Sequence, residues 1–432
     1  MGIIKSLPAR ALPLSIVLLI SNQGHANEIF GGAISANSLV SDNTTKTALE
    51  PIEERQDTYQ AGITADYTNW LIEAEADYQL YAKQFAEKSQ ADEEYVDGSA
   101  SLVFGKEQEP FGLELNHSRR MLLQSPEAVG LVENMDEREI ISAAPIMRAR
   151  IFGSDMLFLQ GQVSQVSFVD DDSRDSKRNA VSAGWAHPVS PTDILQLAIQ
   201  QIDVKFDQQP EFDYALANAM LSYAVQLRKL NYRVEAGVNE SSPETGEKER
   251  SPAYKVEWGY ISGYNNFSAS FSQRLTDTSF GDGNDYGSSE IPSGDGLTLS
   301  LKRVDRKTAD VSWSTDFICA RCSFSIGASF EDDNYLESDE TSRNLYTRSA
   351  FTYSLSSAAS LKFSADRSKY DFDGGEVTDD YFIDYLAAEY SYRFLNNINI
   401  RFFVRKEERD SDSIESSYEE NMYGAGLGYF FQ

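Results

Sequence analysis

Residue types that commonly carry enzyme chemistry are scarce in this 432-residue chain, which has three histidines and two cysteines. His117 stands beside Ser118 in LNHSRR, and His187 lies in WAHPVS. A histidine that takes a proton from a serine is the base of a nucleophilic hydrolase. Neighbouring residues of a strand point to opposite faces, however, so His117 and Ser118 cannot act as one pair if this segment is a strand. We predict that the chain is not an enzyme.

The cysteines and one acidic segment are the remaining candidates for metal or redox chemistry. Cys319 and Cys322, in FICARCSF, form either a disulfide or an inert thiol pair in an exported protein, because no second CxxC or nearby histidine completes a metal site. The segment GDGNDYG (281–287) resembles a calcium loop, but Tyr286 and Ser293 stand where further ligands belong. We expect a solvated turn there, with no metal and no other cofactor.

The charge balance and the N-terminus indicate an exported, acidic protein. There are 68 acidic against 38 basic residues, a net charge of −30, which excludes nucleic acid as a partner because that needs a basic surface. Residues 1–26 are typical of a secretory signal peptide, with Lys5 and Arg10 before an apolar run and a small-x-small motif at its end. We expect residues 27–432 to form one mature domain.

Period-two alternation of apolar and polar residues recurs along the mature chain. It is clearest in IEAEADYQL (72–80) and returns at 232–239, 254–260 and 398–405. This is the period of a strand with one apolar face. No later stretch offers the ~20 apolar residues of a membrane helix, so a chain embedded in a membrane must close into a β-barrel. Aromatic residues, 12% of the chain, suit the interfacial girdles of such a barrel.

The connections between these segments alternate between short turns and longer acidic stretches such as VDDDSRDSKR and RKEERDSDSIESSYEE. Outer-membrane barrels have short periplasmic turns and long external loops. An even strand count follows if both termini are periplasmic, and treating GLTLSLKRVDRKTADVSWST as one strand gives about 20 strands, with a range of roughly 16 to 22. We predict an all-β, antiparallel, up-and-down transmembrane barrel in the outer membrane.

The chain ends in NMYGAGLGYFFQ, which reads as the closing strand of that barrel. Its apolar residues share one face, toward lipid, and its glycines share the other. The pattern resembles the C-terminal signal that the bacterial barrel-assembly machinery recognises, with Gln432 as a departure after the terminal aromatic. The residues that match this assembly signal are Tyr423, Ala425, Leu427, Tyr429 and Phe431.

Several segments resemble the outer-membrane β-barrel porins of Gram-negative bacteria, of the type associated with exopolysaccharide or exosortase systems. The likeness covers most of the mature chain as a pattern and has no catalytic residues to transfer. It implies outer-membrane lipid, lipopolysaccharide and the barrel-assembly machinery as partners, with exopolysaccharide export components as further candidates. The segments are ANSLVSDNTT, QAGITADYTNWLIEAEADYQLYAKQF, SAAPIMRARI, AGWAHPVSPTDILQLAIQQIDVKFD and FSASFSQRLTDTS.

The face opposite the apolar one should line the lumen and carries charges of both signs. Two interpretations stay open: salt-bridge ladders that fill a narrow interior, or a water-filled pore with a transverse field. Acids dominate the early strands and arginines the late ones, so the signs should meet near the seam. We expect passage of small polar solutes or assistance to exopolysaccharide export; the alternative is a non-conducting structural or adhesin-like barrel. The lumen candidates are Glu73, Glu75, Asp77, Arg148, Arg150, Arg233, Arg393, Arg401 and Arg405.

Overall fold

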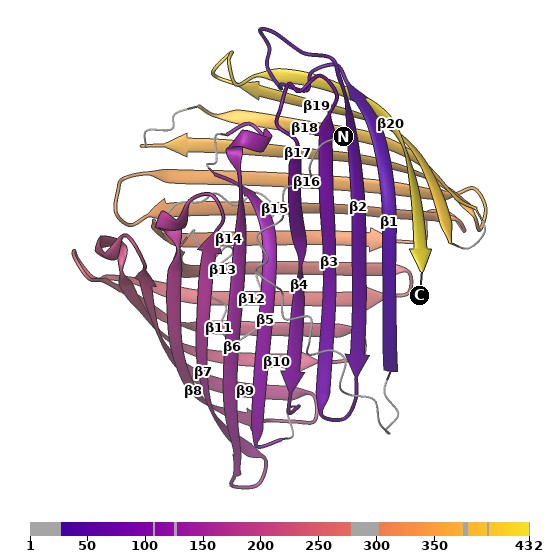
Figure 1. The fold of residues 1–432 in the computed structure, drawn as a ribbon. Coiled ribbons are helices and arrows are strands. Elements are labelled where there is room, and N and C mark those ends of the chain that lie inside the picture. Colours follow the sequence, from indigo (N-terminus) through magenta and orange to yellow (C-terminus); the bar gives the residue numbers. More distant parts are fainter. Residues whose placement is uncertain are drawn as a thin grey trace, which may run out of the picture.

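The computed structural model describes residues 27–106, 109–124, 128–277, 302–374, 379–394 and 397–431. The expected signal peptide, the calcium-like segment 281–287 and Gln432 lie outside these ranges. The described chain forms one antiparallel sheet of 20 strands in which each strand pairs with its neighbours in sequence, and β1 pairs with β20 (Figure 1). The sheet is therefore a closed barrel, and the predicted fold class and even strand number are confirmed.

The strands are 12 to 17 residues long. Their bounds are β1 Asn27–Ser41, β2 Glu54–Thr68, β3 Ile72–Phe85, β4 Glu93–Phe104, β5 Phe111–Leu123, β6 Met135–Ile151, β7 Asp155–Phe168, β8 Ser176–Pro188, β9 Asp193–Phe206, β10 Tyr214–Gln226, β11 Leu230–Pro243, β12 Glu249–Ser262, β13 Asn265–Asp277, β14 Arg303–Thr315, β15 Cys322–Tyr335, β16 Thr341–Ser354, β17 Ala359–Asp373, β18 Tyr381–Phe394, β19 Ile398–Ser411 and β20 Tyr418–Phe431. Three short 3-10 turns, η2 Val132–Asn134, η3 Asp172–Arg174 and η4 Pro210–Phe212, lie in connections. No helix in the described ranges is long and apolar enough to cross a membrane.

The connections at the two ends of the barrel differ in length, as the sequence predicts. At the end where β1 begins and β20 ends, they run from residues 263–264 at the shortest to residues 316–321, where Cys319 forms a disulfide with Cys322 at the start of β15. At the other end they run from residues 244–248 to residues 278–302. Outer-membrane barrels place short turns in the periplasm, so we refer to the two ends as the periplasmic and the outer end.

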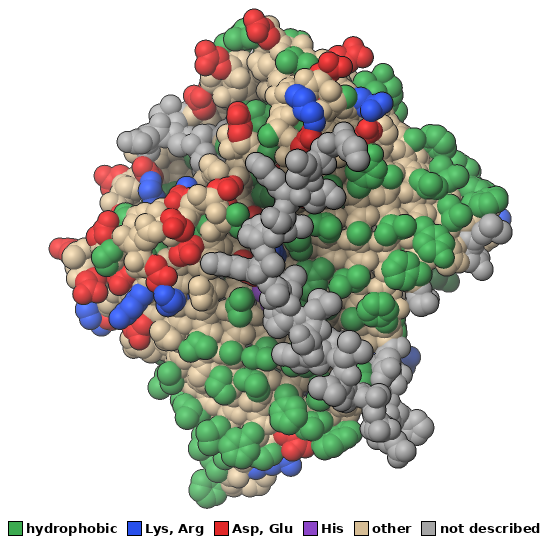
Figure 2. Space-filling view, in the orientation of Figure 1, with side chains coloured by type: hydrophobic (Ala, Val, Ile, Leu, Met, Phe, Trp, Pro, Cys, Tyr) green, Lys and Arg blue, Asp and Glu red, His purple; other side chains and the backbone are tan. Residues whose placement is uncertain are grey.

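The outward face of the wall is an apolar belt. Large side chains such as Leu197, Ile199 and Leu221 are exposed on it, and inward neighbours of opposite parity are polar or small. Apolar side chains cover the wall in the space-filling view, while acidic ones gather toward the end with the longer connections (Figure 2). Because every backbone group of a closed barrel is paired and its outer face is apolar, this is the architecture of an outer-membrane protein.

A girdle of aromatic rings in stacked or edge-on contact follows the periplasmic edge of the belt. Adjacent ring centroids from β12 to β15 lie 5.7 to 6.5 Å apart. Aromatic rings at the membrane interface are the expected anchors of such a barrel. The rings of this girdle are Trp258, Tyr260, Phe267, Trp313 and Phe324.

The outer loops are shorter than the sequence predicts, because the strands extend beyond the belt. Residues 405–420 were expected to form a long loop, but only residues 412–417 lie between β19 and β20. A strand needs roughly 9 to 11 residues to span the bilayer, so strands of this length must project from it. Outward positions of the projecting ends carry ion pairs, such as Lys406 with Glu408 at 3.1 Å and Arg367 with Asp384 at 2.8 Å.

The seam between β1 and β20 explains the glycines of the closing strand. On the lipid face, the ring of Phe431 lies over Gly32, where any added Cβ would overlap it. On the inner face, Arg401 of β19 donates a hydrogen bond of 2.6 Å to Asn37 Oδ1 of β1 across the intervening Gly426. A side chain at Gly426 would collide with Asn37, so the glycine lets two flanking strands be joined over it.

Candidate functional site

The lumen wall is the candidate functional site, and all nine predicted lumen residues have the inward parity of their strands. The register of the strands shows which residues point inward and which point outward, because residues that are paired across neighbouring strands share a face of the sheet. Those opposite the exposed apolar belt face the interior. The nine are Glu73, Glu75 and Asp77 on β3, Arg148 and Arg150 on β6, Arg233 on β11, Arg393 on β18, and Arg401 and Arg405 on β19.

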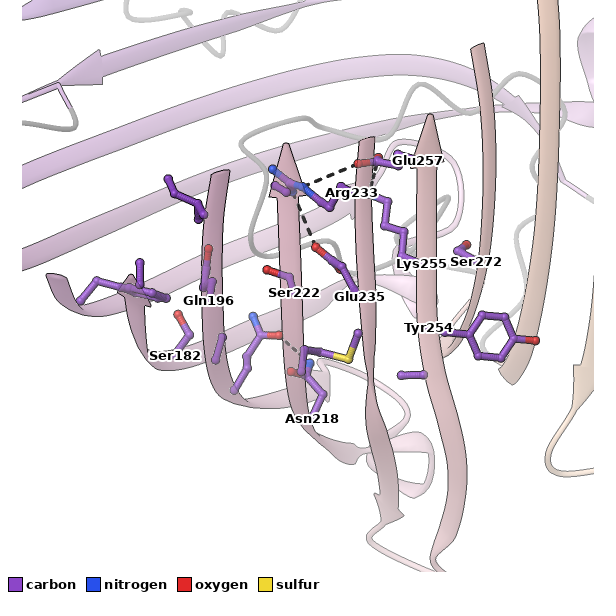
Figure 3. A pocket seen from close by; sticks show the side chains of 18 of the residues that line it. Ser182, Gln196, Asn218, Ser222, Arg233, Glu235, Tyr254, Lys255, Glu257 and Ser272 are labelled. Atoms are coloured by element: carbon purple, nitrogen blue, oxygen red, sulfur yellow. Dashed lines mark hydrogen bonds and ion pairs between the residues drawn. The ribbon is translucent and has the colours of Figure 1, made fainter. Parts of the chain in front are cut away.

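A salt-bridge ladder occupies one sector of this wall. Arg233 of β11 lies 3.7 Å from Glu235 on the same strand and 3.8 Å from Glu257 of β12 (Figure 3). Lys255 lies 2.9 Å from Glu257. These four side chains therefore neutralise one another locally, as the ladder interpretation predicts.

The ladder does not continue around the barrel. Within the described ranges, no carboxylate lies within 4.0 Å of the guanidinium groups of Arg148, Arg150, Arg393 or Arg405, although the Arg405 guanidinium stacks 4.4 Å from the Phe403 ring centre. Below the outer end, a cavity of about 1020 Å³ opens along the inner faces of β6 to β13. The lumen thus combines a local ladder with open, solvent-sized space.

The predicted meeting of opposite charges at the seam does not occur in the described residues. Glu75 and Asp77 lie on β3, which β2, β1 and β20 separate from β19. Arg401 instead joins Asn37, and Glu73 lies 4.0 Å from Lys106 near the periplasmic end. The prediction placed the two groups too close because it did not count the strands between them.

The outer mouth is narrowed on one side by the ends of β13 and β14. The last pair between β12 and β13 is Tyr254 with Gln273, whereas β13 stays paired with β14 up to Asp277 and Arg303. The end of the β13–β14 hairpin therefore separates from β12 after Gln273, while β14 stays paired with β15 up to Val304 and Tyr335. Its outward-parity side chains then lie against the inner face of other strands, since Arg303 Nη1 donates to Ser241 Oγ of β11 at 2.9 Å.

A buried ion pair fixes this inward bend. Arg178, on the inner face of β8, lies with Nη1 2.8 Å from Asp277 Oδ2 and Nη2 3.0 Å from Oδ1, and both side chains have no exposed surface. The Tyr214 hydroxyl also donates to Asp277. Beside them, Leu275 packs into an apolar cluster on the inner wall. The other buried members of that cluster are Ala180, Ile202, Val204, Phe206, Tyr214 and Leu216.

Loops narrow the mouth from the opposite side. The Gln90 side chain joins three of them: it donates to Thr44 O at 2.8 Å and accepts from Val132 N at 3.0 Å. These loops are anchored to the inner face of β19, where Lys46 Nζ lies 2.7 Å from Glu407 Oε1. The described residues of the three loops are 42–53, 86–92, 124 and 128–134, and these parts of the first, second and third outer connections form one cover.

The external loops also set an acidic potential around the mouth. In the loop between β7 and β8, burial raises the pKa of Asp170 and of Asp175, and the Asp136 carboxylate adds to both shifts. In the loop between β15 and β16, the hydrogen bond from Lys302 lowers the pKa of Glu340. Clustered carboxylates raise the local cation concentration, an effect that salt screens over about 8 Å at physiological ionic strength.

Both candidate histidines lie on the outward face. His117 Nε2 is 2.9 Å from Glu139 Oε1 and its Nδ1 is hydrogen-bonded to the Tyr78 hydroxyl. His187 Nδ1 is 2.6 Å from Asp155 Oδ1 near the periplasmic end of the barrel. His117 and Ser118 take opposite faces of β5, as the strand prediction requires.

The residues that narrow the mouth are not among those predicted from the sequence. Arg178 and Asp277 are distant in sequence, and Asp277 has the same parity as the lipid-facing Phe271. A signal was nevertheless present. A charged residue on the lipid parity of a strand is costly in the bilayer, so Asp277 and Arg303 had to lie outside the belt or turn inward.

Comparison with known proteins adds the following. No family model matches the chain, and no curated protein sequence matches it. Similar solved structures include the outer membrane protein OpdK of Pseudomonas aeruginosa (11% identity; 93% of this chain and 99% of that one; TM-score 0.41). OccK2 (OpdF) of the same organism, in complex with glucuronate, is 11% identical, and the match covers 93% of this chain and 98% of that one with a TM-score of 0.42. The siderophore receptor PirA of Acinetobacter baumannii is 10% identical, and the match covers 93% of this chain and 80% of that one with a TM-score of 0.47. The TM-scores are all below 0.5, so the assignment as an outer-membrane β-barrel rests on this chain's own strand pairing and apolar belt.

Proposed function

We propose that this barrel is a porin-like channel that gives small polar solutes passive passage across the outer membrane. The observation that carries the proposal is the cavity of about 1020 Å³ inside a closed barrel, whose lining combines hydrogen-bonding and charged side chains with apolar ones. A wall that served only to hold the fold together would fill this space with packed side chains. Open polar space within a membrane barrel is instead the geometry of a solute path.

The narrowed mouth supports passage of small solutes rather than large ones. The bent end of β13 and β14 and the cover made by three loops both extend over the inner wall at the outer end. A solute must pass between them to reach the cavity from outside. The acidic loops around this entrance should favour cations over anions at low ionic strength.

Reconstitution tests the proposal directly. Purified barrel added to a planar bilayer should produce stepwise conductance, and proteoliposomes should swell in small sugars or amino acids but not in large oligosaccharides. A heat-modifiable band on gel electrophoresis confirms that the preparation is folded. Folded protein that gives no conductance and no swelling would overturn the channel and favour the non-conducting structural or adhesin-like barrel.

Assistance to exopolysaccharide export is a narrower form of the same proposal, and its support is the sequence resemblance alone. A polymer needs a wider opening than a small solute, and the covered mouth argues against a wide one. Surface polysaccharide measured in cells with and without the gene tests this form. Unchanged polysaccharide together with normal conductance would leave small-solute passage as the function.

A further inference from the structure

Inward side chains of β7 to β11 form horizontal rows, because residues paired between neighbouring strands lie side by side. One row consists entirely of uncharged hydrogen-bonding side chains, and all of them line the cavity. We call it the amide row. Its members, in order from β7 to β11, are Gln160, Ser182, Gln200, Asn218 and Asn239.

A second row, one inward position nearer the periplasm, consists of glycines, an alanine and two larger apolar residues. The ring of Phe158 lies across Gly184, where a Cβ would overlap it, and Met220 Sδ would lie 2.6 Å from a Cβ on Gly237. The two glycines thus let a ring and a thioether lie flat against the wall. We call this the shelf, and its members are Phe158, Gly184, Ala198, Met220 and Gly237.

A third row lies below the shelf. It is apolar on β7 and β8, where Met156 pairs with Ala186, and polar from β9 onward. Its polar part begins with Gln196 and Ser222 and continues into Glu235 and Lys255 (Figure 3). Gln196 and Gln200 of β9 are four residues apart, so the two polar rows are about 13 Å apart at 3.3 Å per residue. From β9 to β11 the cavity wall is therefore an apolar shelf between two hydrogen-bonding edges.

The charges of the ladder neutralise one another, whereas Arg148 of β6, which is paired with Phe158 of the shelf, donates to the backbone oxygens of Gly105 and Lys106. Arg233 and Lys255 both contact Glu257, and Arg233 also contacts Glu235. Within the described ranges, the side-chain amides of Gln160 and Gln196 make no hydrogen bond to another part of the chain. An amide offers both donors and an acceptor, which is what a hydroxyl group requires of its partner.

We propose that this wall is a binding subsite for neutral, hydroxyl-rich solutes of about disaccharide size. Such molecules present hydroxyl edges, which the two polar rows would bind, and apolar C–H faces, which Phe158 and Met220 on the shelf would contact. The ladder cancels its own charge, so an ionic solute gains little from it. The proposal deepens the proposed function and rests on it, since it names the solute class that the channel would retain.

Direct binding tests the subsite without requiring conduction. Saturation-transfer NMR on the full barrel, in a detergent without a sugar headgroup, should detect sucrose in the millimolar range. Polyethylene glycol of similar mass, which lacks hydroxyl groups along its chain, should give no saturable signal. Removing two hydrogen-bonding amides with Gln160→Leu and Gln196→Leu should weaken sucrose binding about 25-fold, at roughly fivefold for each of two lost hydrogen bonds.

The chain offers a matched control for that double variant. Gln165 of β7 and Gln201 of β9 have the outward parity, so Gln165→Leu with Gln201→Leu should leave sucrose binding unchanged. Equal binding by the two double variants, or equal signals from sucrose and polyethylene glycol, would overturn the subsite. Conductance measured in parallel separates the two proposals. A barrel that conducts without binding sucrose refutes the subsite alone, and one that binds sucrose without conducting refutes the channel alone.

Discussion

Arg178 of β8 and Asp277 of β13 form a fully buried, bidentate ion pair across the inside of the outer mouth. Four strands, β9 to β12, lie between them in the sheet. The pair therefore does not stabilise a neighbouring strand contact but holds the end of one hairpin over the lumen. Its energetic role and its effect on the pore can be separated by mutation.

Replacing Asp277 with Ala should release the end of β13 and β14 and widen the mouth. Taking one partner from a buried ion pair costs about 3 to 5 kcal/mol, since a guanidinium is left buried without that carboxylate. The 20-strand wall does not depend on this contact, so heat-modifiable migration should persist. We expect a higher single-channel conductance than in the unmodified protein.

The compensating double variant, Arg178→Met with Asp277→Leu, is the control. Replacing a buried ion pair by apolar side chains of similar volume is often neutral or stabilising. It should keep the hairpin end packed beside Leu275 and restore the original conductance. Identical conductance in Asp277→Ala and the unmodified protein would show that the hairpin end does not limit the path.

Sequence reasoning predicted the wall of this barrel well, because the wall depends on local periodicity. The alternation in residues 72–80 set the face of β3, and the terminal pattern through Phe431 set the closing strand. Contacts across the lumen have no local signature. The bend at Gln273 depends on which strands stand opposite it, and that is known only once the barrel has closed. The outer loops were overestimated because charged strand ends above the membrane look like loops.

Ion selectivity should respond unequally to the three late arginines. Arg393 and Arg405 have inward parity and no carboxylate within 4.0 Å in the described ranges, whereas Arg401 is engaged with Asn37. Changing Arg393 and Arg405 to Gln should strengthen cation preference at low salt, and Arg401→Gln should have a smaller effect. Reversal potentials across a salt gradient measure both changes.

Arg367 of β17 provides the control for this experiment, because it faces outward and pairs with Asp384. Arg367→Gln should leave the reversal potential unchanged. The mouth potential should fade at high salt, where screening is stronger. Anion selectivity of the unmodified barrel at low salt would contradict the assignment of an acidic entrance.

The orientation of the barrel makes a separate prediction about accessibility. An epitope inserted after Gly246, in the connection between β11 and β12, should be labelled on intact cells. The same epitope between Gly263 and Tyr264 should be labelled only after the outer membrane is permeabilised, since that turn lies at the periplasmic end. Labelling in the reverse pattern would show that the barrel is inserted the other way.

Closure of the seam should depend on Phe431 and not on its neighbour Phe430. Phe431 faces lipid with its ring over Gly32, whereas Phe430 pairs with the inward Ala33 and faces the lumen. Phe431→Asp removes that contact and the terminal aromatic of the assembly signal, so the protein should accumulate unfolded and protease-sensitive. Phe430→Asp introduces the same charge one residue away, on the face toward the lumen, and should assemble.

Gly32→Val should also impair closure, because its side chain competes with the Phe431 ring. Heat-modifiable migration and protease resistance of outer-membrane fractions distinguish these outcomes; equal assembly of the two aspartate variants would refute the facing assigned to the closing strand.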